Sequence, residues 1–259
     1  MIQIYKKYHI AYWCIGILLL ISFIAALVTI GESAWYVPVL LLIPVVLLIF
    51  VDAFIFTRLA SQKLTKEVIV LYGDCRIREY IDNLQKLFAG RKGTVVSLYN
   101  VLLERGYAAA GEYDKVYECS QKIKSRVYRA QQLESLIDYY INMDRIEDAK
   151  KEIEELRKQS AKIKNVKIRQ SCEISIRNAE YSIRIKQGEY EGAVEHFTNT
   201  LNKLNPLLTF SKVSYSYSIG KVLLLQGEPE KARAYFQTAY DLGGDTKYKR
   251  YAEERLKEI

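Results

Sequence analysis

The sequence predicts an all-α protein, in which a two-helix transmembrane hairpin is followed by a domain of helical repeats. Two long apolar runs near the N-terminus predict the hairpin, because a bilayer core of about 30 Å needs about 20 helical residues to cross it. A short phrase that recurs four times farther along the chain predicts antiparallel helix pairs. Between residues 57 and 228 there is one proline, and apolar residues recur at helical spacing, as in Leu133, Leu136 and Ile137.

Two apolar runs with a short connection define the hairpin. The first run covers residues 10–30 without a formal charge, and the second covers residues 34–56, with Asp52 as its only charge. Each run is long enough to cross a bilayer as a helix. Residues 31–33 form the external turn between them, so the chain is expected to cross the membrane, turn and return.

Basic residues around the hairpin predict its orientation. Lys6 and Lys7 precede the first run, Arg58 and Lys63 follow the second, and the turn has no lysine or arginine. Such residues at the ends of spans stay on the cytoplasmic side. Residues 1–9 and the C-terminal domain are therefore both expected in the cytoplasm, and the protein is expected in the cytoplasmic (plasma) membrane.

Other interpretations of the N-terminal region are open. A cleaved signal peptide is one, but the first run is long for such a segment, and no A-x-A-like cleavage site precedes the second run. Pro38, Pro44 and the ionisable Asp52 fit a transport element inside an oligomer. A bent anchor helix with an interfacial aspartate explains them more simply, because Asp52 lies close to the end of its run.

The net charge of +8 belongs to the cytoplasmic part, because the charges of residues 1–56 cancel. A basic domain beneath an anionic leaflet predicts contact with anionic lipid, whereas no motif indicates nucleic acid. Acidic and basic residues are mixed, as in residues 150–155, which is typical of a solvated helix face.

A phrase of six residues recurs in the cytoplasmic part, with copies that begin at Gly111, Asp144, Gly188 and Gly227. Its first residue suits the left-handed end of a helix, and the acidic residues that follow favour the first turn of the next helix. The sixth residue is alanine in three copies, which lets two helices approach closely. The residue four positions later is apolar in three copies.

This pattern resembles the tetratricopeptide repeat over residues 95–259. Spacings of 33, 44 and 39 residues between the turns compare with about 34 in that family. The resemblance implies about four helix pairs stacked into a curved α-solenoid. The residues that carry it or pack its helices are Gly111, Tyr113, Ala149, Gly188, Tyr190, Ala193, Phe197, Gly220, Gly227, Ala232, Phe236 and Ala239.

Residues 57–94 connect the hairpin to the repeats. They are expected to be helical and to add a degenerate helix pair, with a turn near Gly73 and Asp74. Residues 90–94 are expected to be a flexible linker, with Thr94 as the N-cap of a helix that begins at Val95.

The resemblance also implies that the first helix of each repeat lines a concave face on which partners bind. Carried over by position, this face holds Arg105, Glu134, Asp138, Asn178, Ser182, Lys186, Tyr217 and Lys221. Some family members clamp the carboxylates of a peptide C-terminus with a lysine and asparagine pattern that this chain does not reproduce. The ligand is therefore open.

No group of residues in the sequence predicts catalysis. His9 and His196 have no partners for a metal site or a triad. Both are expected to be exposed or at an edge. The four cysteines lie too far apart for a zinc motif or a redox pair; they are Cys14, Cys75, Cys119 and Cys172. No catalytic residue, metal or cofactor is expected.

The sequence thus predicts a non-enzymatic, membrane-anchored interaction or scaffold protein whose cytoplasmic domain binds a protein partner. Two alternatives stay open. One is a non-catalytic or transport-related subunit of a membrane complex, and the other is an adaptor that binds anionic lipid through its basic surface.

Overall fold

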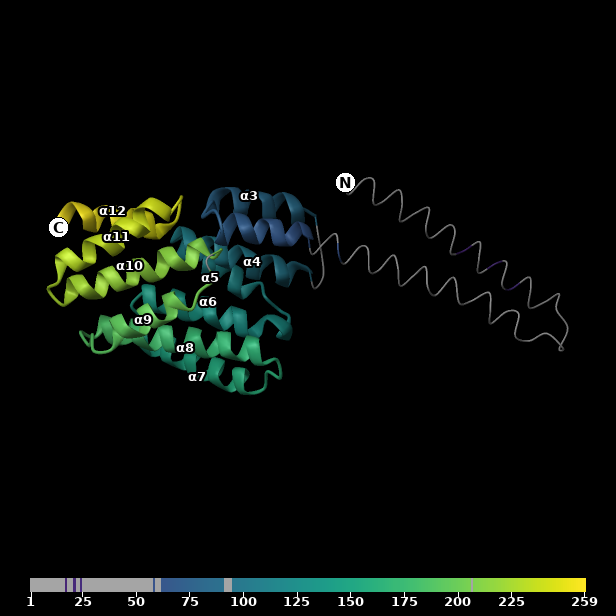
Figure 1. Cartoon of the computed structure of the whole chain (residues 1–259). Coiled ribbons are helices and arrows are strands. Elements are labelled where there is room, and N and C mark those ends of the chain that lie inside the picture. The colour runs from purple at the N-terminus through teal and green to yellow at the C-terminus, as the bar shows by residue number, and fades with distance from the viewer. Residues whose placement is uncertain are drawn as a thin grey trace. The chain divides into compact units, whose positions relative to one another are not determined.

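A computed structural model of the protein (Figure 1) describes residues 62–90, 95–205 and 207–259, together with Ile17, Ile21, Ile24 and Arg58. The chain divides into two compact units, Met1–Leu64 and Thr65–Ile259, and the helical-repeat domain is the second. The expected hairpin lies outside the described residues apart from three isolated positions. Within the described segments, no helix is both long and apolar enough to cross a bilayer.

The described part of the chain is all-α, without strands. Residues 62–72 are helical, and a turn at residues 73–74 separates them from the next helix, where a turn was expected. The helices that follow are α3 (Ile77–Phe88), α4 (Val95–Ala110), α5 (Tyr113–Gln121), α6 (Arg129–Asn142), α7 (Ile146–Ala161), α8 (Val166–Lys186), α9 (Ala193–Asn202), α10 (Thr209–Leu225), α11 (Pro229–Leu242) and α12 (Lys247–Glu258). α4 begins at Val95, as predicted.

Consecutive helices pack against each other, most extensively α10 with α11 and α6 with α7, followed by α4 with α5 and α11 with α12. Across the repeats, α4 packs on α6 and α6 packs on α8. This row does not continue to α10, which packs instead on α9, α11 and α12. The domain is therefore helical-repeat-like, with an interruption between α8 and α10.

The recurring phrase marks four helix ends with one hydrogen-bond pattern. Its first residue has a positive φ in every copy: 80° at Gly111, 60° at Asp144, 85° at Gly188 and 79° at Gly227. The next backbone N–H then donates to a carbonyl five positions earlier, at 2.8–2.9 Å: Glu112 to Tyr107, Arg145 to Tyr140, Glu189 to Arg184 and Glu228 to Leu223. This is the Schellman ending of a helix, so the phrase encodes the same turn even where aspartate replaces glycine.

We expect Gly227→Ala to lower the free energy of unfolding by about 1–2 kcal/mol, because alanine resists the left-handed conformation. A Cβ at Gly227 would meet nothing within 4 Å, so the change tests the backbone alone. Gly227→Asn is the matched control, and it should cost less because asparagine tolerates positive φ. Urea denaturation of the purified variants measures both. Equal stability of the alanine variant and the wild type would contradict this explanation of the turn.

The second helix of each pair packs through the small position of the phrase. Val116, Ala149, Ala193 and Ala232 are all fully buried. The side chains four positions later are buried as well; they are Ser120, Ile153, Phe197 and Phe236. Where α10 crosses α11, a Cβ at Gly220 would lie 3.0 Å from the Phe236 ring, so a glycine permits that close approach.

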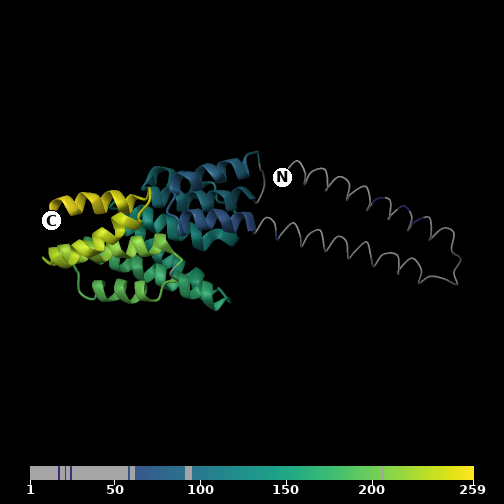
Figure 2. The same ribbon diagram turned by 45° about the horizontal axis from the view of Figure 1, so that its top comes forward.

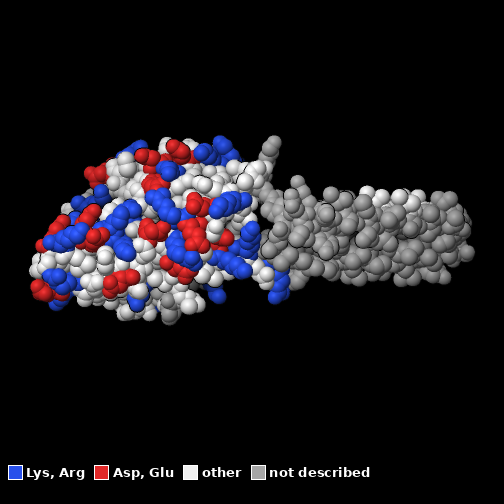
Figure 3. All heavy atoms as spheres, turned by 90° about the horizontal axis from the view of Figure 1, so that it is seen from above, with Lys and Arg blue, Asp and Glu red and all other residues white. Residues whose placement is uncertain are grey.

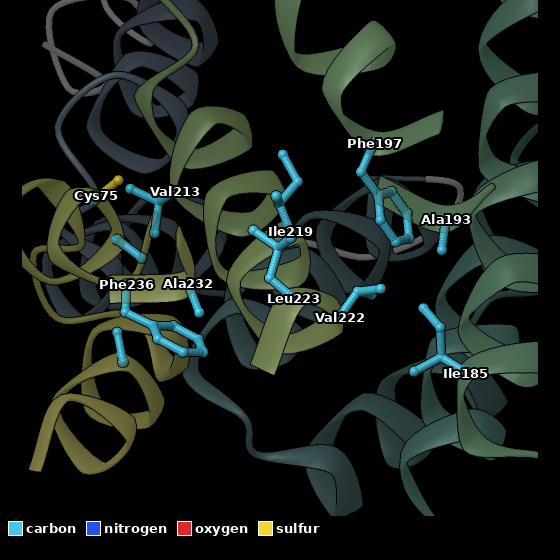
Figure 4. Packing of buried hydrophobic residues seen from close by; sticks show 12 residues of the cluster. Cys75, Ile185, Ala193, Phe197, Val213, Ile219, Val222, Leu223, Ala232 and Phe236 are labelled. Carbon is cyan, nitrogen blue, oxygen red and sulfur yellow. The ribbon is translucent and has the colours of Figure 1, made fainter. Parts of the chain in front are cut away.

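Two hydrophobic clusters lie in the interior of α6–α12, and the described residues of α3–α5 bury further apolar side chains, such as Ile77, Leu84 and Val116. One joins α6, α7 and α8 around Leu133 and Leu156. The other joins α9–α12 and takes in Ile185 from the end of α8. Figure 4 shows Ile219 and Leu223 of α10 between Phe197 on one side and Phe236 on the other.

The segment between α11 and α12 is hydrogen-bonded to the start of α3, far away in the sequence. The sequence did not predict this contact. The backbone N–H of Asp245 donates to the carbonyl of Cys75 at 3.1 Å. The Asp245 carboxylate accepts from the N–H groups of Ile77 and Arg78 at the start of α3. Gly244 has a φ of +54° and lies so close to the Cys75 carbonyl that a Cβ would clash. In Figures 1 and 2 the yellow C-terminal helices accordingly lie beside α3.

Charged side chains of both signs cover the face of the domain drawn in Figure 3. Many charged side chains of the described helices pair one helical turn apart, such as Lys150 with Glu147 at 2.9 Å and Lys257 with Glu253 at 2.9 Å. Exposed pairs of this kind contribute little to stability. The mixture agrees with the expected solvated helix faces.

Candidate binding cavity

The structure brings seven of the eight residues assigned to the concave face into one cavity of about 440 Å³. They follow helical spacing on three helices. Glu134 and Asp138 come from α6; Asn178, Ser182 and Lys186 come from α8; Tyr217 and Lys221 come from α10. The cavity lies at the interruption between α8 and α10, where the row of packed helices stops.

Arg105, the eighth residue, does not line the cavity. It lies on α4 near Tyr72, Glu134 and Tyr80, and Tyr72 contributes most to raising its pKa. Burial raises the pKa of Glu134, while Ser175 and Arg105 oppose that rise. The positive charge of Arg105 thus favours the charged form of Glu134, which does line the cavity.

Helix α12 supplies a wall of the cavity that sequence reasoning missed. Lys247, Tyr248 and Tyr251 line it. The Lys247 side chain is 5 % exposed, and its Nζ lies 2.6 Å from the Tyr113 hydroxyl and 3.5 Å from the Asp138 carboxylate. Nζ also lies 4.8 Å and 5.0 Å from the ring centres of Tyr113 and Tyr248, which adds cation–π attraction.

Lys247 stays charged although it is buried. Burial lowers its pKa, but Asp138 and the two tyrosines outweigh this effect and hold the pKa well above its ordinary value. The cation thus ties α12 to α5 and α6. In the sequence this lysine stands in a highly charged segment, residues 247–258, and no local signal distinguishes it from its neighbours.

Two further lysines, Lys186 and Lys221, line the cavity near the C-terminal ends of α8 and α10, and both are solvent-exposed. Lys186 pairs with Asp144 at 2.9 Å. Lys221 makes no ion pair or hydrogen bond within the described residues. The surrounding walls, and then the positive charges of Lys186 and Arg255, lower the pKa of Lys221. An uncompensated positive charge therefore stands at the cavity.

Asn178 of α8 is held by hydrogen bonds to α10 and α9; Asn178 and Tyr215 line the cavity, whereas His196 does not. The Asn178 amide donates to the Tyr215 hydroxyl at 2.6 Å, and its carbonyl oxygen lies 2.8 Å from His196 Nε2. The His196 ring stacks on Tyr181 with 4.5 Å between ring centres. Burial, and then Arg177, lower the pKa of His196. His196 is half-buried and hydrogen-bonded rather than exposed, while His9 lies outside the described residues.

Three serines of the lining present acceptor oxygens. Ser182 donates to the carbonyl of Asn178 at 2.9 Å, Ser214 to that of Ser211 at 3.0 Å, and Ser218 to that of Ser214 at 2.9 Å. A hydroxyl has one donor and two lone pairs. Because each of these three hydroxyl hydrogens already bonds a backbone carbonyl, the serine oxygens can only accept hydrogen bonds from a ligand.

The described residues also settle the state of three cysteines. Burial raises the pKa of Cys75 and of Cys119 to about 11, and it raises that of Cys172 as well. These thiols are therefore protonated and weakly reactive at neutral pH. In the described segments, no three His, Cys, Asp or Glu side chains come together as a metal site.

Comparison of the chain with protein-family models, with curated proteins and with solved structures finds no match.

Proposed function

We propose that the protein is a membrane-anchored interaction protein. In this proposal residues 10–56 form the hairpin anchor, and a solenoid of the tetratricopeptide type binds a cytoplasmic protein partner. The observation that carries the binding role is the cavity: seven residues selected as a partner-binding face lie together, beside a positive charge, that of Lys221, which no described residue neutralises. Because α12 forms one wall of the cavity, the partner in this proposal contributes a short segment rather than a long groove-bound stretch.

The two alternatives have less support. The adaptor for anionic lipid needs a continuous basic surface, and the face in Figure 3 shows both signs of charge intermixed. The transport-related subunit depends on Pro38, Pro44 and Asp52, which lie outside the described residues.

Tags at the N- and C-termini should both resist labelling by membrane-impermeant reagents in intact cells and become labelled after permeabilisation. The expectation follows from the basic residues that flank the hairpin on one side. Labelling of a C-terminal tag in intact cells would reverse the topology and remove the cytoplasmic partner from the proposal.

Cross-linking followed by pull-down from native membranes tests the binding role. The full-length chain is compared with the anchor alone, residues 1–64. We expect a partner to be captured with the full-length chain and not with the anchor. Capture of the same proteins by both would assign the interaction to the membrane segment, as in the alternative of a membrane-complex subunit.

A further inference from the structure

The cavity has the size of a small-molecule site. Its volume of about 440 Å³ falls within the range of roughly 300–1,000 Å³ that is usual for such sites. It differs from an open peptide groove because α12, fastened to α5 and α6 through Lys247, forms one wall. A partly open space of this size, lined by polar and apolar side chains together, favours a compact ligand.

The charges around the cavity favour a ligand with an anionic group. Of the three lysines in the lining, Lys247 is paired with Asp138 and Lys186 with Asp144, whereas Lys221 has no partner in the part of the chain that the structure describes. Arg255 pairs with Glu258 at 2.5 Å, yet its positive charge still contributes to lowering the pKa of Lys221. A carboxylate or phosphate next to Lys221 would relieve this repulsion and form a charge-assisted hydrogen bond.

The remaining walls favour a ligand that donates hydrogen bonds. Ser182, Ser214 and Ser218 have already donated their hydrogens to the backbone, so they can only accept from a ligand. Tyr217 and Tyr248 line the same space as a packed aromatic pair, with 5.7 Å between their ring centres. Hydroxyl groups on a compact carbon skeleton match this combination of acceptors and rings.

We propose that the cavity binds a small hydroxylated organic anion, of the class of sugar phosphates and sugar acids, with the anionic group placed against Lys221. The inference goes beyond the proposed function and does not require the partner. Because Lys186 and Lys221 also belong to the candidate partner-binding face, the bound anion would control access of the partner to the cavity.

Isothermal titration calorimetry on the full-length protein in detergent tests the proposal with four probes. Glucose 6-phosphate and gluconate carry hydroxyls together with a phosphate or a carboxylate. Glucose lacks the anionic group, and inorganic phosphate lacks the carbon skeleton. We expect one or both organic anions to bind, and to bind more tightly than either glucose or phosphate. Tighter binding of glucose 6-phosphate would identify a phosphate as the anionic group, and tighter binding of gluconate would identify a carboxylate.

Lys221→Met should weaken that binding by roughly 10- to 100-fold, which corresponds to the loss of one hydrogen bond to a charged group. Lys158→Met removes an exposed lysine of α7 outside the cavity lining and should leave the affinity unchanged. Circular dichroism checks that both variants keep the helical fold. The proposal is overturned if neither organic anion binds, if glucose binds as tightly as they do, or if the methionine at position 221 has no effect.

Discussion

Replacing Glu104 by glutamine should stabilise the domain by an amount that grows as the pH rises from about 4.5 to about 8. Glu104 is fully buried on α4, and burial raises the pKa of its carboxyl from 4.5 to about 8. In this pH range the folded protein keeps the proton and the unfolded chain loses it. Stability of the wild type therefore falls as the pH rises, by up to about 5 kcal/mol in total.

The glutamine variant cannot titrate at this position, so the difference between the two proteins isolates the effect. Urea denaturation of both at pH 5 and pH 8 measures it. Any cost of burying the amide is the same at both pH values and cancels in the comparison. Glu118→Gln is the matched control, because Glu118 is exposed on the neighbouring α5. A Glu104→Gln effect that does not change between pH 5 and pH 8 would show that Glu104 titrates normally in the folded protein.

Ala232→Trp should unfold or loosen the last helix pair, at a cost of roughly 3 kcal/mol or more, because a large ring there overpacks a site without free space. Ala232 is fully buried, and its carbonyl lies 3.3 Å from the position that a Cβ at Gly220 would take. Thermal melting of the full-length variant measures the loss.

Lys221→Met is the matched control for this substitution, since it changes an exposed side chain on the facing helix α10. It should melt within a few degrees of the wild type, as surface changes usually do. If the lysine variant melts early and the tryptophan variant does not, the helical register of the last pair is wrong, and the placement of Tyr217 and Lys221 at the cavity falls with it.

Local sequence patterns were sufficient to predict the helix-ending turns and the helical spacing, because both depend on residues close together in the chain. The phrase that begins at Gly111, Asp144, Gly188 and Gly227 predicted four turns, because a left-handed residue and a small contact residue are local requirements. The same reasoning placed seven residues of the cavity, since they recur one helical turn apart on α6, α8 and α10. Their role as a binding surface stays a prediction.

The closure of the domain depends on contacts between residues far apart in the chain, and such contacts leave no periodic signal. Lys247 forms a hydrogen bond with Tyr113 and an ion pair with Asp138. The Asp245 carboxylate accepts hydrogen bonds from the backbone at the start of α3. Arg105 was assigned to the concave face by the same positional rule, but it lies outside the cavity lining, near Tyr72 and Glu134.

The central claim, that a protein partner enters the cavity, is tested most directly by site-specific photocross-linking in native membranes. A photoreactive residue replaces either Lys186, which is exposed at the cavity, or Lys158, which is exposed on α7 outside its lining. Both substitutions change exposed lysines, so both proteins should fold. We predict that the full-length chain forms a covalent adduct with a protein from position 186 and none from position 158. An adduct from position 158 alone, or from neither position, would contradict the proposed binding site.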